Sequence, residues 1–220
     1  MTITLVFLAA LLAFFLGWIL SRTVNVEPWV ADGGTLNDRL PEILTTPRVA
    51  LAIFLAVASS LFALSISAYH MRMEFGHDWL AVPSPWLLWA NTGILVLGSL
   101  ALQWSWNAAR RDDAAGLRRW LFIGGGLTGA FVIGQMLVWR DLAAGGYYMT
   151  VNPANAFFYF LTGLHALHLL GGLVAWLRVV KRQRDGASPE ALCSGVELCT
   201  IYWHYLLVIW FILFALLLTT

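Results

Sequence analysis

The chain alternates long uncharged stretches with shorter charged ones. Six stretches contain no Asp, Glu, Lys or Arg and are 18 to 22 residues long: 3–20, 49–69, 86–106, 120–138, 156–177 and 198–218. A helix needs about 20 apolar residues to cross a hydrocarbon core about 30 Å thick. These runs lack the alternation of barrel strands, and a lipid-exposed helix satisfies its own backbone hydrogen bonds. The pattern therefore predicts an all-α, polytopic transmembrane helical bundle.

A polar segment separates the first stretch from the other five. Residues 22–47 contain three prolines and a Gly-Gly pair, which interrupt helices. We expect an N-terminal transmembrane anchor with a cytoplasmic linker in residues 1–46 and a five-helix domain in residues 47–220. Arg22 follows the first apolar stretch and no basic residue precedes that stretch, so a retained anchor is favoured over a cleaved signal peptide.

The basic residues predict the orientation. The first, third and fifth loops carry eleven Arg or Lys residues, whereas the second and fourth carry only Arg72 and Arg140. Because basic loops stay in the cytoplasm, we expect a multi-pass protein of the bacterial inner membrane with both termini outside. A content of 60% hydrophobic and 11% charged residues is unlike that of soluble domains. The net charge of +1 gives no indication of a nucleic-acid partner.

Small residues predict where helices approach each other closely. The second stretch has a stripe of them on one helix face: Ala52, Ala56, Ser59, Ala63 and Ser67. The fourth stretch has Gly125 and Gly129 at four-residue spacing. Such spacing is typical of helix packing in membranes.

Three histidines are the most informative polar residues within the stretches. His165 and His168 lie about 60° apart around a helix axis, and His204 on the last stretch differs in height from His168 by about 5 Å. We expect them to share a polar cluster. A structural, hydrogen-bonding role between the last two helices is favoured, and axial ligation of a b-type haem or binding of another metal is the alternative. The stretches contain no carboxylate or basic side chain, which argues against a self-sufficient proton pump.

Several motifs resemble one known family. Residues 157–168 read Phe-Phe-Tyr-Phe-Leu-Thr-Gly-Leu-His-Ala-Leu-His. This segment resembles the Phe-Phe-x-x-x-Thr-Gly-x-His-Gly-x-His signature of subunit III of the haem-copper respiratory oxidases, the cytochrome c and quinol oxidases. Other segments are similar to that family as well: Tyr202-Trp203-His204-Tyr205 with the later Trp210, Gly195-Val196-Glu197, Tyr69-His70, Asn91-Thr92 and Gln135. The resemblance extends from Pro47 to the C terminus.

The resemblance implies a five-helix core with its C terminus outside. It implies a non-catalytic subunit of a terminal oxidase in the aerobic respiratory chain, which docks beside subunits I and II and stabilises subunit I. Such a chain carries no haem, no copper, no other metal and no catalytic residue. Haem and copper belong to the partner subunits, and cytochrome c or quinol is an indirect partner through them. The helices of this family form a V-shaped cleft that holds phospholipid.

Two sets of site residues follow. We expect a structural polar cluster of His165, His168, Trp203, His204, Thr162 and Gln135. A phospholipid phosphate requires a cation near the headgroup level. The candidates for this role are His70, Arg72 and Arg140 on the outer side and Arg110, Arg178 and Arg182 on the inner side.

The chain departs from the family pattern at acidic positions. It lacks the membrane glutamate expected near Val57, the glutamate expected at Val138 and the aspartate expected at Leu207. Helix packing and histidine hydrogen bonds do not require these acids, so the structural role survives in a divergent branch. Two rival functions stay open: an accessory subunit of a nitric oxide reductase, and a membrane cytochrome with b haem on His165 or His168 and His204.

Overall fold

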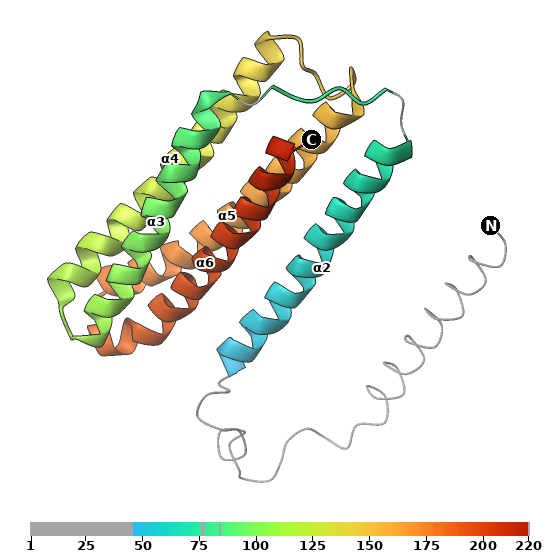
Figure 1. Ribbon diagram of the computed structural model, residues 1–220. Coiled ribbons are helices and arrows are strands. Elements are labelled where there is room, and N and C mark those ends of the chain that lie inside the picture. Colours follow the sequence, from blue (N-terminus) through green and yellow to red (C-terminus); the bar gives the residue numbers. More distant parts are fainter. Residues whose placement is uncertain (1–45, 76–77, 84, 220) are drawn as a thin grey trace, which may run out of the picture. The chain divides into compact units, whose positions relative to one another are not determined.

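The computed structural model describes residues 46–75, 78–83 and 85–219 (Figure 1). Within these ranges there are five helices and no strands: α2 Thr46–Phe75, α3 Trp86–Arg110, α4 Ala114–Ala144, α5 Pro153–Arg184 and α6 Pro189–Thr219. Each is long and apolar enough to cross a membrane. The predicted all-α transmembrane bundle with a five-helix core is confirmed. The first predicted stretch and its linker lie outside the described residues.

The helix ends are defined by capping residues. Asp113 and Asn152 precede α4 and α5, and their side chains accept backbone N–H groups of the first turns at 2.9 and 3.0 Å. This satisfies donors that have no partner within the helix. Gly146 and Gly186, with φ of 85° and 89°, follow α4 and α5, where a left-handed conformation ends a helix. The helices therefore extend past the uncharged stretches into the charged loops.

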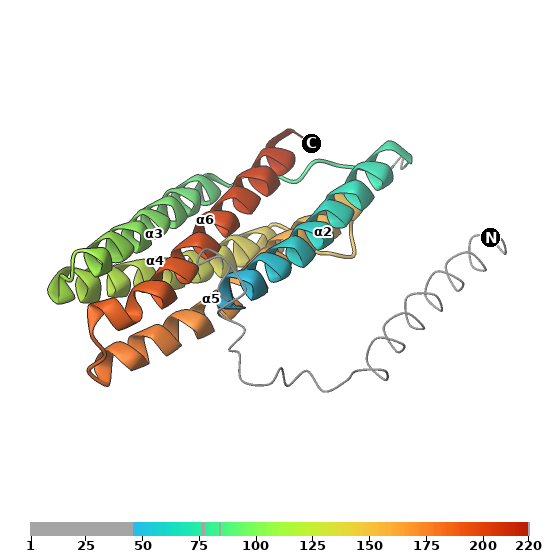
Figure 2. The ribbon, with the colours of Figure 1, turned by 90° about the horizontal axis from the view of Figure 1, so that it is seen from below.

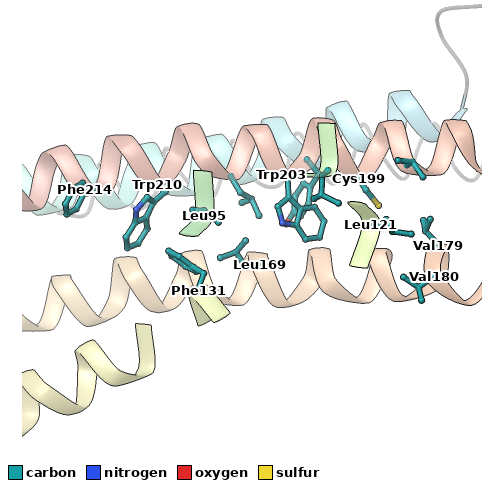
Figure 3. Packing of buried hydrophobic residues seen from close by; sticks show 14 of the residues in the cluster. Leu95, Leu121, Phe131, Leu169, Val179, Val180, Cys199, Trp203, Trp210 and Phe214 are labelled. Carbon is teal, nitrogen blue, oxygen red and sulfur yellow. The ribbon is translucent and has the colours of Figure 1, made fainter. Parts of the chain in front are cut away.

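The larger core lies between α3, α4, α5 and α6. Trp203 and Trp210 of α6 and Phe131 of α4 are fully buried. Figure 3 shows these rings and Leu169 of α5 following one another along the helices, between α6 and α5. Large rigid rings in the middle of the bundle fix the distances between these four helices.

α2 stands to one side of this four-helix group. Figures 1 and 2 show it on the side of α5 and α6, away from α3 and α4. It joins a second, smaller cluster of buried residues: Phe62, Tyr69, Leu161, Ile209, Leu213 and Leu216. Only 17% of its most apolar segment is buried, against 33 to 44% for the other helices. Most of the α2 surface is therefore left to face lipid or a partner.

The small-residue predictions hold only in part. The five residues of the predicted stripe on α2 are exposed, and among them Ser59 reaches a neighbouring helix, where its Oγ lies 3.0 Å from the Tyr205 hydroxyl of α6. On α4 the close approaches occur at Gly124 and Gly125. A Cβ at Gly124 would lie 2.8 Å from the Leu102 side chain, whereas Gly129 faces open space. The spacing identified a helix face but not the neighbour that covers it.

Candidate functional site

His204 of α6 joins two helices through both ring nitrogens. Nδ1 lies 2.5 Å from Ser99 Oγ and Nε2 lies 2.9 Å from Gln103 Oε1, both on α3. Since Nε2 donates to the amide oxygen, the neutral ring accepts the Ser99 hydroxyl at Nδ1. Gln103 also donates to Asn107 Oδ1 at 3.3 Å. These four residues form what we call the α3–α6 hydrogen-bond chain, and it corrects the expected pairing of His204 with α5.

His165 of α5 is completely buried among aromatic rings. Its ring centroid lies 5.1 Å from that of Trp210 on α6 and 5.9 Å from that of Phe131 on α4. Neither ring nitrogen has a hydrogen-bond partner among the described residues. His165 therefore packs as an aromatic ring where α4, α5 and α6 meet.

His168 faces α2 instead. Its Nδ1 lies 2.8 Å from the carbonyl oxygen of Leu164 in its own helix. Its ring centroid is 5.2 Å from that of Phe62 and 6.2 Å from that of Phe54, both on α2. The turn of 60° between His165 and His168 is enough to move from one side of α5 to another. The expectation of one shared histidine cluster is corrected: the three rings contact three different sets of neighbours.

The other members of the expected cluster link helices in pairs. Trp203 Nε1 donates to Thr128 Oγ1 at 2.8 Å and so connects α6 with α4. Thr162 Oγ1 accepts from Trp139 Nε1 at 3.0 Å and connects α5 with α4. These are separate contacts and not one network, although each satisfies a polar group that hydrocarbon could not.

Gln135 of α4 contacts Asn91 of α3. Both residues belong to the family resemblance, but this contact was not predicted. The Oε1 of Gln135 lies 3.4 Å from Asn91 Nδ2. Ser99 and Gln103 were not among the residues predicted to contact His204. Their signal was present, because polar residues at positions 99, 103 and 107 recur every four residues on one helix face.

A groove of about 750 Å³ lies between α2, α5 and α6. Leu51 and Phe54 of α2 form one wall. The rest is formed by α5 and α6: Leu167, His168, Gly171, Gly172, Ala175, Arg178, Val179, Gly195, Leu198, Cys199, Tyr202 and Trp203. A Cβ on Gly172 would lie 2.7 Å from the Tyr202 ring, while Gly171 has open space above it. Most of the lining side chains are apolar, and the glycines leave space that a larger side chain would fill.

An ion pair holds α2 to α6 beside the groove. Nη2 of Arg48 lies 2.9 and 2.8 Å from the two carboxylate oxygens of Glu197. The Glu197 side chain is 18% exposed and that of Arg48 is 35% exposed. Glu197 is the neighbour in sequence of Leu198, which lines the groove. The pair therefore restrains the separation of α2 and α6 at this end.

The six predicted lipid-binding residues are not equivalent. Arg178 is the only charged residue among the described residues that line the groove. Arg72 forms an ion pair with Asp78, with an N···O distance of 2.8 Å. Five of the six line no part of the groove: His70, Arg72, Arg110, Arg140 and Arg182. The geometry thus singles out Arg178 as the cation for a groove ligand.

Side chains of the types that bind metals do not come together among the described residues. In the part of the chain that the structure describes, no group of three or more His, Cys, Asp or Glu side chains is placed to hold a metal ion. The rings of His168 and His204 contact α2 and α3, respectively. Two axial haem ligands would have to point at one iron from opposite sides, whereas the contacts of His168 and His204 are with different helices.

Comparison with known proteins identifies the family. The cytochrome c oxidase subunit III family profile matches residues 48–219. The cytochrome c oxidase subunit 3 of Thermostichus vulcanus is 32% identical over 178 residues, which cover 77% of this chain and 85% of that protein. The probable cytochrome c oxidase subunit 3 of Mycobacterium tuberculosis is 31% identical over 160 residues, 71% of this chain and 77% of that protein. The Synechocystis protein of the same name is 32% identical over 171 residues, 76% and 72% of the two chains. This chain therefore belongs to the cytochrome c oxidase subunit III family.

Proposed function

We propose that this chain is the non-catalytic third subunit of a haem-copper terminal oxidase, where it docks beside subunits I and II and stabilises subunit I. The observation that carries the proposal is the family match over residues 48–219. The redox centres would reside on the partner subunits, and cytochrome c or quinol would deliver electrons to those subunits. The relatives carry oxidase names, so we propose an oxidase and not a nitric oxide reductase as the complex.

The proposed location is the bacterial inner membrane, with the basic loops in the cytoplasm. Five apolar helices make the chain a multi-pass membrane protein. The excess of Arg and Lys in alternate loops supports the proposed orientation. In this orientation the groove lies in the cytoplasmic half of the bundle, because it contains the ends of α5 and α6 that adjoin the basic fifth loop.

We propose that the groove holds a phospholipid. Its apolar walls suit acyl chains, and the guanidinium of Arg178 suits a phosphate, which it can bind through two parallel hydrogen bonds. Tyr202 anchors one wall, because its hydroxyl donates to the carbonyl oxygen of His168 at 2.8 Å. A lipid in this place would fill the space between α2 and the four-helix group and so connect them.

Purification through a tag on this chain tests the proposed complex. We expect a haem-copper subunit to co-purify and the preparation to reduce oxygen. A preparation that reduces nitric oxide and lacks oxygen reductase activity would contradict the proposal.

A pair of glycine variants tests the lipid. Gly171→Phe adds a ring at the groove, and nothing lies within 4 Å of its Cβ. Gly126→Phe is the matched control, since Gly126 on α4 has equally open space and does not line the groove. Native mass spectrometry of the gently extracted complex should show fewer bound phospholipids for Gly171→Phe alone. Equal lipid content in both variants and the original chain would argue against a lipid in the groove.

A further inference from the structure

A second candidate binding site lies at the turn between α3 and α4, away from the groove. Two cavities of about 390 and 330 Å³ adjoin here and share Asn107 and Arg111 in their linings. The larger is also lined by Trp104 and Trp120, and the smaller by Arg110. The site thus combines guanidinium groups, an amide and two indole rings around one hollow.

The charge of this turn is positive. Residues 104–120 contain four arginines and two aspartates. The carboxylate of Asp113, which also lines the larger cavity, accepts the N–H of Gly116 and caps α4. Neither Arg110 nor Arg111 takes part in the ion pairs found among the described residues. Their guanidinium groups are therefore available to an anion from outside the chain.

Aromatic rings place the cavities at the level of lipid headgroups. The ring centroids of Trp104 and Trp120 are 4.6 Å apart. The guanidinium carbon of Arg110 lies 5.5 Å from the Trp106 ring centre, and that of Arg119 lies 5.5 Å from the Trp120 ring centre. Tryptophan is enriched at the membrane interface because one part of its ring system is apolar and the N–H is polar. A phosphate bound here would sit at the depth of phospholipid phosphates.

An apolar track leads from the cavity toward the bilayer centre. Leu97, Leu100 and Trp104 are 54%, 42% and 46% exposed. Their spacing of three and four residues puts them on one face of α3. Such a track suits an acyl chain, whereas a free phosphate would make no use of it.

We propose that the α3–α4 turn binds an anionic phospholipid, with its phosphate on Arg110 and Arg111 and an acyl chain along Leu97 and Leu100. This site does not depend on the groove or on Arg178. An arginine near a membrane surface contributes about 1 kcal/mol to binding of anionic lipid. Loss of each arginine should thus weaken retention about fivefold.

The test compares lipid retention by the full oxidase complex after incubation with vesicles of equal parts phosphatidylglycerol and phosphatidylcholine. Native mass spectrometry counts the phosphatidylglycerol that remains bound. We expect a loss of one bound molecule in Arg110→Gln/Arg111→Gln, and about fivefold weaker binding of phosphatidylglycerol in Arg111→Gln alone, which tests the site even if the double variant does not assemble. Lys181→Gln is the matched control, because Lys181 is an exposed basic residue that lines neither cavity.

Three results would overturn the proposal. One is an unchanged amount of bound phosphatidylglycerol in the arginine variants, including the case in which only Gly171→Phe loses lipid. Another is an equal loss in Lys181→Gln, which would show a general effect of surface charge. The third is displacement of the lipid by inorganic phosphate alone, which would show a site for free anions.

Discussion

Replacing His204 with Leu tests the α3–α6 hydrogen-bond chain. The change removes the contacts at 2.5 Å to Ser99 and at 2.9 Å to Gln103 but keeps an apolar side chain of similar reach. An interhelical hydrogen bond in a membrane protein contributes about 0.6 kcal/mol on average and up to about 1.7 kcal/mol. Two such bonds predict a loss of about 1–3 kcal/mol in the free energy of unfolding.

A double-mutant cycle isolates the shorter of the two bonds. The full chain is unfolded with SDS in mixed micelles and followed by circular dichroism for His204→Leu, Ser99→Ala and the combination. We expect a coupling energy of about 0.6–1.7 kcal/mol between the two positions. His70→Leu is the control, because the exposed His70 makes only an edge contact with the Tyr69 ring among the contacts described. Retention of His204→Leu in the proposed oxidase complex should fall, while the haem spectrum of that complex stays unchanged.

Independent effects of the two substitutions would contradict a hydrogen bond between His204 and Ser99. Unconnected sites add to within about 0.3–0.5 kcal/mol, so a coupling energy inside that range would refute the bond. An effect of His204→Leu no larger than that of His70→Leu would refute the whole α3–α6 chain as a stabilising element.

Two further predictions concern packing and charge. Gly125→Ala should destabilise the full chain toward SDS by about 1–3 kcal/mol, the usual cost of overpacking, because its Cβ would overlap the Trp176 ring. Gly126→Ala is the control and should not destabilise the chain, because nothing lies within 4 Å of its Cβ. Equal effects of the two substitutions would contradict the overlap with Trp176. Glu197→Gln and Arg48→Gln should show a coupling energy of about 1 kcal/mol in the same assay, the upper end for partly exposed pairs. That coupling should fall at high salt, and additive effects would rule out the ion pair as a link.

The helices followed from the sequence because one physical property determines them. An uncharged stretch of about 20 residues has to be helical in hydrocarbon, whatever its neighbours are. The ends were placed less well: α5 continues to Arg184 and α4 begins at Ala114, both beyond the uncharged stretches. Charged side chains end the hydrocarbon segment, but only capping residues such as Asp113 end the helix.

The partners of the polar residues did not follow from the sequence. His204 and Gln103 are 101 positions apart and Arg48 and Glu197 are 149 positions apart, and no local pattern states which helices become neighbours. Periodicity indicates which residues share a face of a helix. Which helix packs against that face depends on the tertiary arrangement of the bundle. The histidines were therefore recognised as important, while their separate environments became visible only in three dimensions.

The separation between Gln103 and His204 along the chain has a consequence for biosynthesis. At about 5–20 residues per second, the ribosome needs about 5–20 s to make the intervening segment. During this interval α3 is already in the membrane while the imidazole that its amide and hydroxyl will meet does not yet exist. Neutral side chains tolerate such a delay far better than ionised ones would. The polar residues of α3 can therefore remain in the membrane without their α6 partner until the last helix has been made.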